Sequence, residues 1–435
     1  MSRTTRVALV AAVATLAGAG CVLFESLDRD ALQPGDGGAE ADGDGGDVGD
    51  GETETEADGE AAVCGNGTVE PGEACEPGDV DIAARNACGE TCSRTCLATC
   101  AWAPCDTAAT AELDCDGGDD DGDGIRDECL WCREHPPAGY AGLYAVGGSD
   151  REHLWAVGER GEVTPYATYR SAGGTWMAAD VSDLAASSYL TAVWISPAGA
   201  PWVADSVGNV FAGDAAGLGW VTVGGGPVEP GVLLTGLAGD LAEDVWVVGY
   251  GGAAHWDGDA WTPADMSELD LQAVTRTAVG DTWAVGFAGA SVRWPAGGVA
   301  EEHGLPGAAS GLDVVQDATG TLWAGGGAEA DGLGEGVLLR WSGGAWERVA
   351  LPAGTGRVVG VWPCAQDGSL WVVVLPDTYA GSEVLVRRAG GWWERIYEPR
   401  VEDSNAGLYG IWGAATADGY EVWVVGDVIL HYLAE

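Results

Sequence analysis

The sequence contains no lysine. All 19 basic side chains among its 435 residues are arginine, and 68 aspartates and glutamates bring the formal net charge to −49. Binding to nucleic acid or to an anionic lipid surface by charge requires clustered cations. The composition therefore excludes nucleic acid as a partner, and it excludes a membrane surface held by charge.

Common catalytic patterns are also missing. The five histidines, at positions 135, 153, 255, 303 and 431, stand alone without metal-ligand spacing, and no Gly-x-Ser-x-Gly elbow occurs. Arginines such as Arg340 and Arg395 flank expected strands and are better explained as surface residues than as a sialidase triad. Cys364 has neither a base nor a cation near it in the sequence, so we expect a buried thiol. We expect a protein that is not an enzyme.

Residues 1–20 have the features of a secretory signal peptide: Arg3 and Arg6, an apolar run too short to span a membrane, and small residues up to Gly20. Cys21 follows directly, and this junction resembles the lipobox of bacterial lipoproteins, although Gly18 stands where that family usually has Leu. The resemblance implies lipidation of Cys21, and Val22 after it favours the outer membrane and cell surface. The alternative is a secreted protein with a leftover thiol.

Residues 21–62 form the lipidated N-terminus and a linker. Positions 33–62 hold 11 acids and no base, aromatic or cysteine. Such a segment cannot bury enough apolar surface to offset its ordering entropy, and its charges repel one another. We expect a disordered acidic tether.

Residues 63–136 form a cysteine-rich module with ten cysteines in an exported chain, which predicts a disulfide-stapled unit. Zinc is the alternative, because several spacings suit a metal ligand set. The motif Cys-Gly-Asn-Gly at 64–67 followed by Glu-Pro-Gly-Glu at 70–73 resembles the cysteine-rich repeat of myxobacterial surface proteins. The pairing of the later cysteines stays open. The predicted disulfide cysteines are Cys64, Cys75, Cys88, Cys92, Cys96, Cys100, Cys105, Cys115, Cys129 and Cys132.

The same module contains alternating aspartates around Gly124: Asp119, Asp121, Asp123 and Asp127. This spacing places several hard oxygens about one ion, as in calcium loops, and the Gly-Ile-x-Asp ending resembles the thrombospondin type-3 repeat. We expect a structural Ca²⁺ here, with a solvated acidic turn as the alternative.

Residues 140–435 contain 19 of the 21 tryptophans and repeat about every 45 residues. Each of seven units has a short apolar strand, a strand of the Trp-Ala-Val-Gly type, a third strand and, after a Gly turn, a fourth that opens with Trp. Four short strands per unit are typical of a β-propeller blade. The last unit lacks its fourth strand. We expect either that a strand before Leu143, which could include Trp131, supplies it and closes the ring, or that the sheet edge stays open and is shielded by the cysteine-rich module.

The sequence therefore predicts an all-β, seven-bladed β-propeller preceded by a disulfide-rich module and an acidic linker. The Gly-x-x-Trp turns resemble those of neuraminidase-like and photosystem-assembly-factor-like propellers, and the whole unit resembles tryptophan-rich repeats of myxobacterial secreted proteins. We expect the repeated Trp to pack between blades.

Long insertions between the second and third strands occur at 326–335 and 376–382, on one face of the predicted ring. Because function concentrates in loops on a rigid scaffold, they predict a recognition surface with Glu329, Asp331, Asp377 and Tyr379; neutral loop drift is the alternative. We expect a monomeric binding lipoprotein that recognises a glycan or a protein and touches the membrane only through its lipid. The alternative is a sialidase-like propeller hydrolase or lyase.

The lipid anchor is directly testable. A palmitate analogue fed to the producing bacterium should label the protein, and Cys21→Ala should abolish the label, because Cys21 is the predicted acceptor. Equal labelling of the variant, measured by in-gel fluorescence after click chemistry, contradicts lipidation at Cys21.

Overall fold

A computed structural model of the chain describes residues 75, 77, 79–85, 91–96, 131–134, 136–161, 163–171, 174–184, 187–214, 219–225, 232–264, 269–376, 381–397, 406–416 and 419–433. Within these residues no helix has the length and hydrophobicity to cross a membrane. The chain divides into two compact units, of which Leu23–Leu113 is one and the propeller belongs to the other.

The smaller unit contains an antiparallel pair of strands, β1 (Val80–Arg85) and β2 (Thr91–Thr95). A disulfide joins Cys75 to Cys96 across this pair, and Cys96 N–H donates to Asp79 O. The disulfide prediction is confirmed for these two cysteines. Cys132 contributes its backbone to a strand of the propeller and Cys92 contributes its backbone to β2, and the other predicted disulfide cysteines lie outside the described residues.

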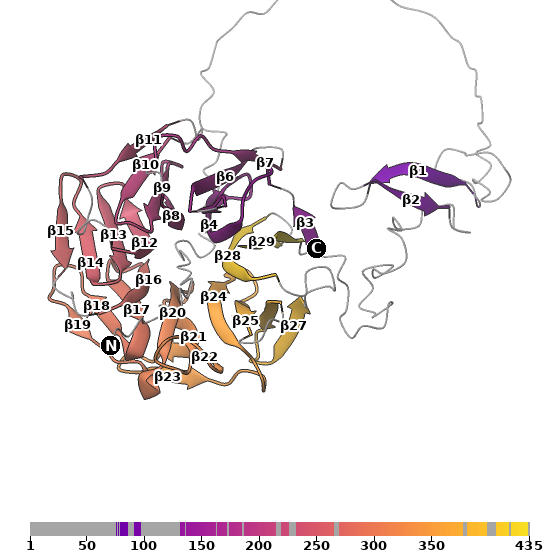
Figure 1. The fold of residues 1–435 in the computed structure, drawn as a ribbon. Helices are drawn as coiled ribbons and strands as arrows, with labels where there is room; N and C mark the ends of the chain where they lie inside the picture. The colour runs from indigo at the N-terminus through magenta and orange to yellow at the C-terminus, as the bar shows by residue number, and fades with distance from the viewer. Residues whose placement is uncertain are drawn as a thin grey trace, which may run out of the picture. The chain divides into compact units, whose positions relative to one another are not determined.

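Seven four-stranded sheets form a seven-bladed β-propeller, and Figure 1 shows their first strands around the centre. Blades one to three are β4 (Gly142–Asp150), β5 (His153–Glu159), β6 (Pro165–Ser171) and β7 (Thr175–Ala178); β8 (Leu190–Ile195), β9 (Pro201–Asp205), β10 (Val210–Gly213) and β11 (Trp220–Thr222); and β12 (Leu234–Leu241), β13 (Asp244–Gly249), β14 (Gly252–Trp256) and β15 (Trp261–Ala264).

Blades four and five are β16 (Leu271–Arg276), β17 (Thr282–Gly286), β18 (Ser291–Trp294) and β19 (Glu301–Glu302); and β20 (Ser310–Gln316), β21 (Leu322–Gly327), β22 (Gly336–Trp341) and β23 (Trp346–Val349). Blade six is β24 (Arg357–Pro363), β25 (Leu370–Leu375), β26 (Glu383–Arg387) and β27 (Trp393–Tyr397). Two 3₁₀ turns, η3 (Phe287–Gly289) and η4 (Pro306–Ala308), lie in the loops of blade four and between blades four and five.

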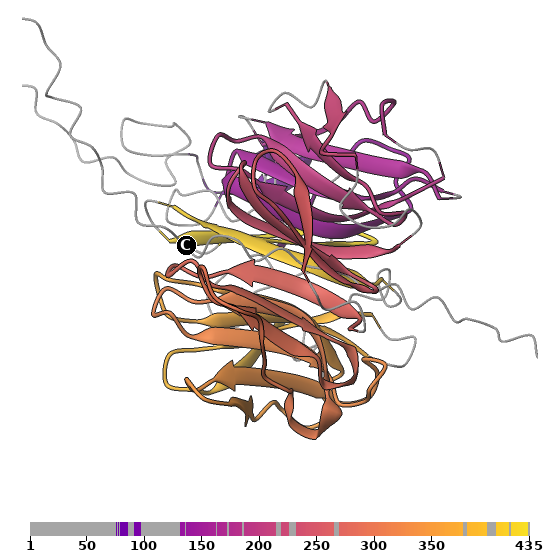
Figure 2. The same ribbon diagram turned by 90° about the vertical axis from the view of Figure 1, so that its left-hand side faces the viewer.

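Blade seven combines the two ends of the propeller sequence. It contains β28 (Leu408–Ala415), β29 (Tyr420–Gly426) and β30 (Ile429–Leu433), and its fourth strand is β3 (Trp131–Glu134), paired antiparallel with β30. In Figure 2 the yellow strands of blade seven lie beside the purple strands of blade one. The expected closing strand is therefore present and includes Trp131. The propeller begins at Trp131 rather than at 140, so these residues do not belong to the cysteine-rich module to which we assigned 63–136.

The first strand of every blade carries a β-bulge at the same place. The register shifts at residues 144, 191, 235, 272, 312, 359 and 409. A bulge leaves one residue out of the ladder and redirects its side chain. An alanine or glycine follows the bulge in six blades, and Asp313 follows it in blade five. Small residues suit this position because neighbouring first strands approach closely: a Cβ on Gly410 would lie 3.2 Å from Ala145 Cα. The seven bulged residues thus form a ring around the central channel.

The tryptophans pack between blades, as expected. Six blades have a fourth-strand tryptophan whose indole N–H donates to the preceding blade. The pairs are Trp131 with Ile396 O (2.7 Å), Trp176 with Glu134 Oε2, Trp220 with Asp180 O (2.9 Å), Trp261 with Val223 O (3.0 Å), Trp346 with Ser291 Oγ (2.9 Å) and Trp393 with Ala350 O (2.8 Å). Blade four is the exception, because Ala300 stands opposite Trp294, where the other blades place the indole.

First-strand tryptophans fill a second position between blades, which requires glycine on the neighbouring strand. A Cβ on Gly148 of blade one would lie 2.9 Å from Trp412 Cη2 of blade seven, and a Cβ on Gly239 of blade three would lie 2.9 Å from Trp194 Cη2 of blade two. An alanine at either glycine would have to displace an indole ring that is itself buried.

A buried charge network holds the closing strand. His431 of β30 is 5% exposed, and its ring nitrogens lie 3.0 Å from Glu134 of β3 and 3.0 Å from Glu421 of β29. Arg170 of β6 pairs with Glu134 at 3.2 Å, and Arg151 pairs with Glu421 at 2.9 Å. The His431 ring stacks on Trp423 at 4.3 Å. Blade one therefore contributes cations to both carboxylates of blade seven.

The protonation of this network follows from its partners. Burial alone would lower the pKa of His431, but hydrogen bonds and charge from Glu134 and Glu421 raise it above its ordinary value. Burial would raise the pKa of Glu134 and of Glu421, but His431 and the arginines lower both. The folded state therefore favours an imidazolium between two carboxylates.

This arrangement predicts a loss of stability at alkaline pH. A raised His431 pKa contributes stability below about pH 6.5, the unfolded value, and this contribution is lost as pH rises through the folded pKa. His431→Gln should lower the free energy of unfolding at pH 6 by about 3–5 kcal/mol, the cost of removing one partner from a buried ion pair. The substitution should also reduce the loss of unfolding free energy at alkaline pH, measured by denaturant titration across pH.

His255→Gln is the matched control. His255 of β14 occupies the corresponding place in blade three, stacked on Trp246 and paired with one carboxylate, Asp244, at 2.7 Å, but it is about one third exposed. This control should keep the alkaline decline of the wild type. If His431→Gln loses as much unfolding free energy at alkaline pH as the wild type does, a group other than His431 causes the loss.

Candidate functional site

The candidate site lies at the channel mouth on the face that carries the loops between second and third strands. Each first strand begins at this face and each second strand ends there, and backbone hydrogen bonds such as Phe287 N–H to Asp270 O join the two. The bulged residues and the residues at these strand ends therefore come together around one opening.

Five aromatic side chains, which we call the aromatic arc, surround this mouth on blades seven, one, two, three and four: Tyr409, Tyr144, Tyr189, Tyr250 and Phe287. The ring centroids of Tyr144 and Tyr189 lie 5.5 Å apart, those of Tyr144 and Tyr409 lie 5.9 Å apart, and those of Tyr250 and Phe287 lie 6.0 Å apart. All five rings are half-buried. The arc forms because the ring of blades brings positions 144 and 409 together.

Carboxylates border the aromatic arc. Burial raises the pKa of Tyr144, and a hydrogen bond and the charge of Glu159 raise it further. Burial also raises the pKa of Tyr189, Tyr250 and Tyr409, with added effects from Glu159, Asp270 and Asp427 respectively. The charge of Arg357 opposes this shift at Tyr409, and a hydrogen bond from Gln272 opposes it at Tyr250. Among the residues that the structure describes, three carboxylates and one arginine, Arg357 of blade six, thus act on the tyrosines of the mouth.

Below the arc, the bulge of blade four contributes Gln272. Its side chain is 1% exposed, and its amide nitrogen donates to Leu271 O at 3.2 Å. Its Oε1 is buried and has no hydrogen-bond partner among the described residues. A buried acceptor without a donor is costly, so this oxygen is a candidate for contact with a bound molecule or water.

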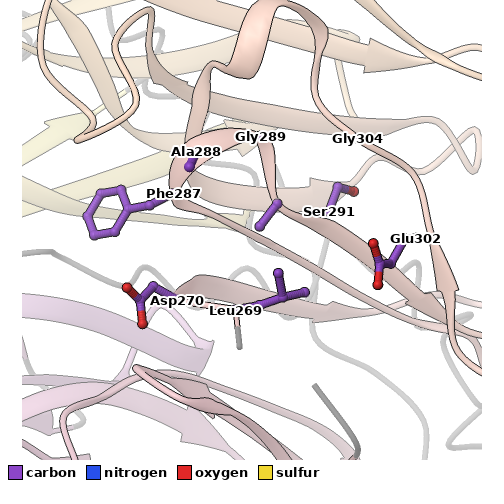
Figure 3. Close-up of a pocket in the computed structure, with 9 residues that line it drawn as sticks. Leu269, Asp270, Phe287, Ala288, Gly289, Ser291, Glu302 and Gly304 are labelled. Atoms are coloured by element: carbon purple, nitrogen blue, oxygen red, sulfur yellow. The ribbon is translucent and has the colours of Figure 1, made fainter. Parts of the chain in front are cut away.

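A cavity of about 280 Å³ adjoins the mouth in blade four. Leu269, Asp270, the Phe287–Ser291 segment, Glu302 and Gly304 line it, and Figure 3 shows the Asp270 and Glu302 carboxylates on either side of Leu269. It lies in the blade without a fourth-strand tryptophan. Because Phe287 and Asp270 also belong to the mouth, the pocket extends the same site.

The insertion of blade five, predicted to be a recognition loop, covers this region. Its first two glycines, Gly326 and Gly327, continue β21, so the loop itself is 328–335. Glu329 and Asp331 are exposed on it, and Ala330 O accepts from Ala288 N–H at 3.0 Å. The loop therefore packs on the pocket-lining turn η3, and neither predicted acid is among the residues that line the pocket.

The other predicted site residues are not all placed. Asp377 and Tyr379 lie outside the described residues, as do Cys21, Asp119, Asp121, Asp123 and Asp127. Within the described part of the chain, no group of three or more His, Cys, Asp or Glu could hold a metal ion. The calcium and lipidation predictions remain predictions.

The sequence analysis missed the aromatic arc, although the repeats carry a signal for it. Ala-Gly-Leu-Tyr occurs at 141–144 and again at 406–409, and an aromatic follows the second-strand Gly at Tyr250 and Phe287. The same position holds Glu159 in blade one and Asp427 in blade seven. Comparing the residues after the Leu at the start of the first strands and after the Gly at the end of the second strands would have collected most of the mouth.

No protein-family model and no curated protein matches this chain. Several solved structures match it. The structure of streptogramin B lyase aligns with a TM-score of 0.58 at 14% identity, covering 70% of this chain and 97% of that one. YCF48 bound to D1 peptide aligns with a TM-score of 0.54 at 17% identity (70% and 97%), and virginiamycin B lyase from Staphylococcus aureus with 0.55 at 12% (70% and 99%). At these identities the similarity shows a shared propeller fold.

Proposed function

We propose that this protein is a cell-surface binding lipoprotein without catalytic chemistry, and that its propeller recognises a partner, a glycan or a protein, through the channel mouth. The observation that carries the proposal is the aromatic arc. Half-buried tyrosines beside carboxylates combine large rigid contact area with hydrogen-bonding groups, a composition enriched in recognition surfaces.

The composition of the mouth supports binding over the sialidase-like alternative. A sialidase site needs three arginines for its anionic substrate, whereas Arg357 is the arginine whose charge reaches the mouth tyrosines. The surrounding carboxylates disfavour an anionic ligand. A neutral or cationic partner fits this potential better.

The similar structures do not choose between binding and chemistry. One neighbour is described as bound to a peptide, and two others are lyases. Because one fold hosts unrelated functions, the choice depends on the site. The aromatic arc and its carboxylates are the basis of our proposal.

The segments before the propeller are consistent with a role in displaying the propeller at the cell surface. In the proposed arrangement, lipid on Cys21 anchors the protein in the outer membrane, residues 33–62 act as a solvated tether, and the disulfide module with its proposed Ca²⁺ loop acts as a spacer. The propeller then stands away from the lipid with its mouth open to partners.

A glycan and protein-ligand array, probed with the full chain, tests the proposal. Any ligand found should be recovered unmodified by mass spectrometry. The double substitution Tyr144→Ser/Tyr409→Ser should weaken binding at least about thirtyfold, because central aromatic contacts contribute about 2 kcal/mol or more each.

Val279→Ser is the matched control. Val279 lies in the turn between β16 and β17, at the opposite end of the first strands, and is 75% exposed. The control should bind as the wild type does. Conversion of a ligand to product, or loss of binding in Val279→Ser but not in the tyrosine variant, would contradict the proposal.

A further inference from the structure

We infer that the channel mouth binds a single organic ammonium group, carried either by a small quaternary amine or by a lysine side chain of a protein. The inference rests on the proposed function, because it names the chemistry that the same mouth recognises. Three features of the mouth point to it: the orientation of the rings, the distribution of charge and a buried acceptor.

The rings form walls rather than a platform. The planes of Tyr144 and Tyr189 meet at 63°, those of Tyr144 and Tyr409 at 49°, and those of Tyr250 and Phe287 at 69°. A sugar ring stacks best on one flat face, whereas a compact cation gains from several faces turned toward one point. Rings at steep angles to one another offer no common flat face for a sugar, and this arrangement favours an ammonium group over a stacked sugar.

The charges around the mouth favour a cation. Glu159 lies beside Tyr144 and Tyr189, Asp270 beside Tyr250, and Asp427 beside Tyr409. Together they resist negative charge on every tyrosine of the arc. Asp427 itself is partly desolvated, which raises its pKa although Gly407 N–H donates to it at 2.8 Å. A bound ammonium would stabilise the charged form of this desolvated carboxylate and pair with the negative charge beside the tyrosines.

Arg357 is the opposing charge. It begins β24 on blade six, acts on Tyr409, and has other partners of its own. The aromatic arc spans blades seven to four in ring order, so the tyrosines of blades one and two lie away from this arginine. We therefore place the ammonium against Tyr144, Tyr189 and Glu159.

Gln272 supplies the third feature. Its buried Oε1 has no partner among the described residues, and a hydrogen bond from the same side chain to Tyr250 of the adjacent blade three lowers the pKa of that tyrosine. An N–H donor entering the channel would satisfy this acceptor. The pocket beside Tyr250 adds Asp270 and Glu302, and its lining contains no basic side chain. A protonated lysine placed against Tyr144 and Tyr189 can donate to Glu159, whereas a quaternary amine can only contact the rings.

Matched ligands separate charge from shape. The full chain is titrated calorimetrically with choline and with 3,3-dimethyl-1-butanol, which has the same shape without the charge. A second pair is a peptide with one central lysine and the same peptide with norleucine. Each cationic ligand should bind at least about tenfold more tightly than its neutral counterpart, since cation–π and carboxylate contacts together exceed roughly 1.4 kcal/mol.

Substitutions then place the ligand. Tyr144→Leu should weaken binding of the cationic ligand about five- to thirtyfold, from about 1–2 kcal/mol for one desolvated ring. Glu159→Gln, which keeps the shape, should weaken it by a smaller factor. Tyr169→Leu is the control, because Tyr169 is a half-buried tyrosine in the third strand of the same blade that packs on Trp155 at 5.1 Å. It should bind as the wild type does.

Each outcome decides a claim. Tighter binding of the lysine peptide than of choline identifies a protein ligand, and the reverse order identifies a small amine. Equal binding of charged and neutral ligands, or no binding of either cation while an array ligand still depends on Tyr144, overturns the ammonium inference and leaves the proposed function standing. If no ligand responds to Tyr144→Leu or Tyr409→Leu, both proposals fail.

Discussion

The structure depends on packing between neighbouring blades, which at six of the seven joints includes a hydrogen bond from a fourth-strand indole N–H to the blade before it. A blade has two faces and can bury them only against its neighbours, so the ring is stable only if every joint is filled. Tryptophan provides a large apolar surface together with one donor, which the carbonyl or side-chain oxygen of the preceding blade accepts. Trp131 and Trp176 extend this joint across the closure, where β3 and the His431 network complete the last blade.

The rigidity of these joints positions the candidate site. Seven identical bulges aim seven side chains at one channel, and the character of the mouth is then set by which residues occupy the bulges and the adjoining strand ends. The mouth is aromatic on one side, where the bulges carry Tyr144 and Tyr409, and aliphatic on the other, where they carry Leu312 and Val359. Blade four departs from the pattern, since Ala300 stands where the other blades place tryptophan, and its face holds the pocket.

The sequence predicted the blades because Trp, Gly and alternating apolar residues report local strand and turn structure, which repeats with the blade. It predicted the insertion that carries Glu329 and Asp331 because the length of a loop can be read from the sequence, and the role of these acids in binding stays a prediction. It did not reveal the aromatic arc, since Tyr144 and Tyr409 are far apart in the chain and meet only after ring closure. The boundary at 140 was wrong for the same reason: a four-residue strand such as 131–134 has no local signal that assigns it to the far end of the chain.

The central claim is that a partner binds at the channel mouth. Hydrogen–deuterium exchange of the full chain, with and without the ligand that the array identifies, tests it most directly, because bound ligand slows local opening of the backbone that it contacts. We expect slower exchange at 141–144, 187–189, 249–250 and 406–409. Slower exchange confined to the opposite turns, at 150–153, 241–244 and 277–281, would contradict the account.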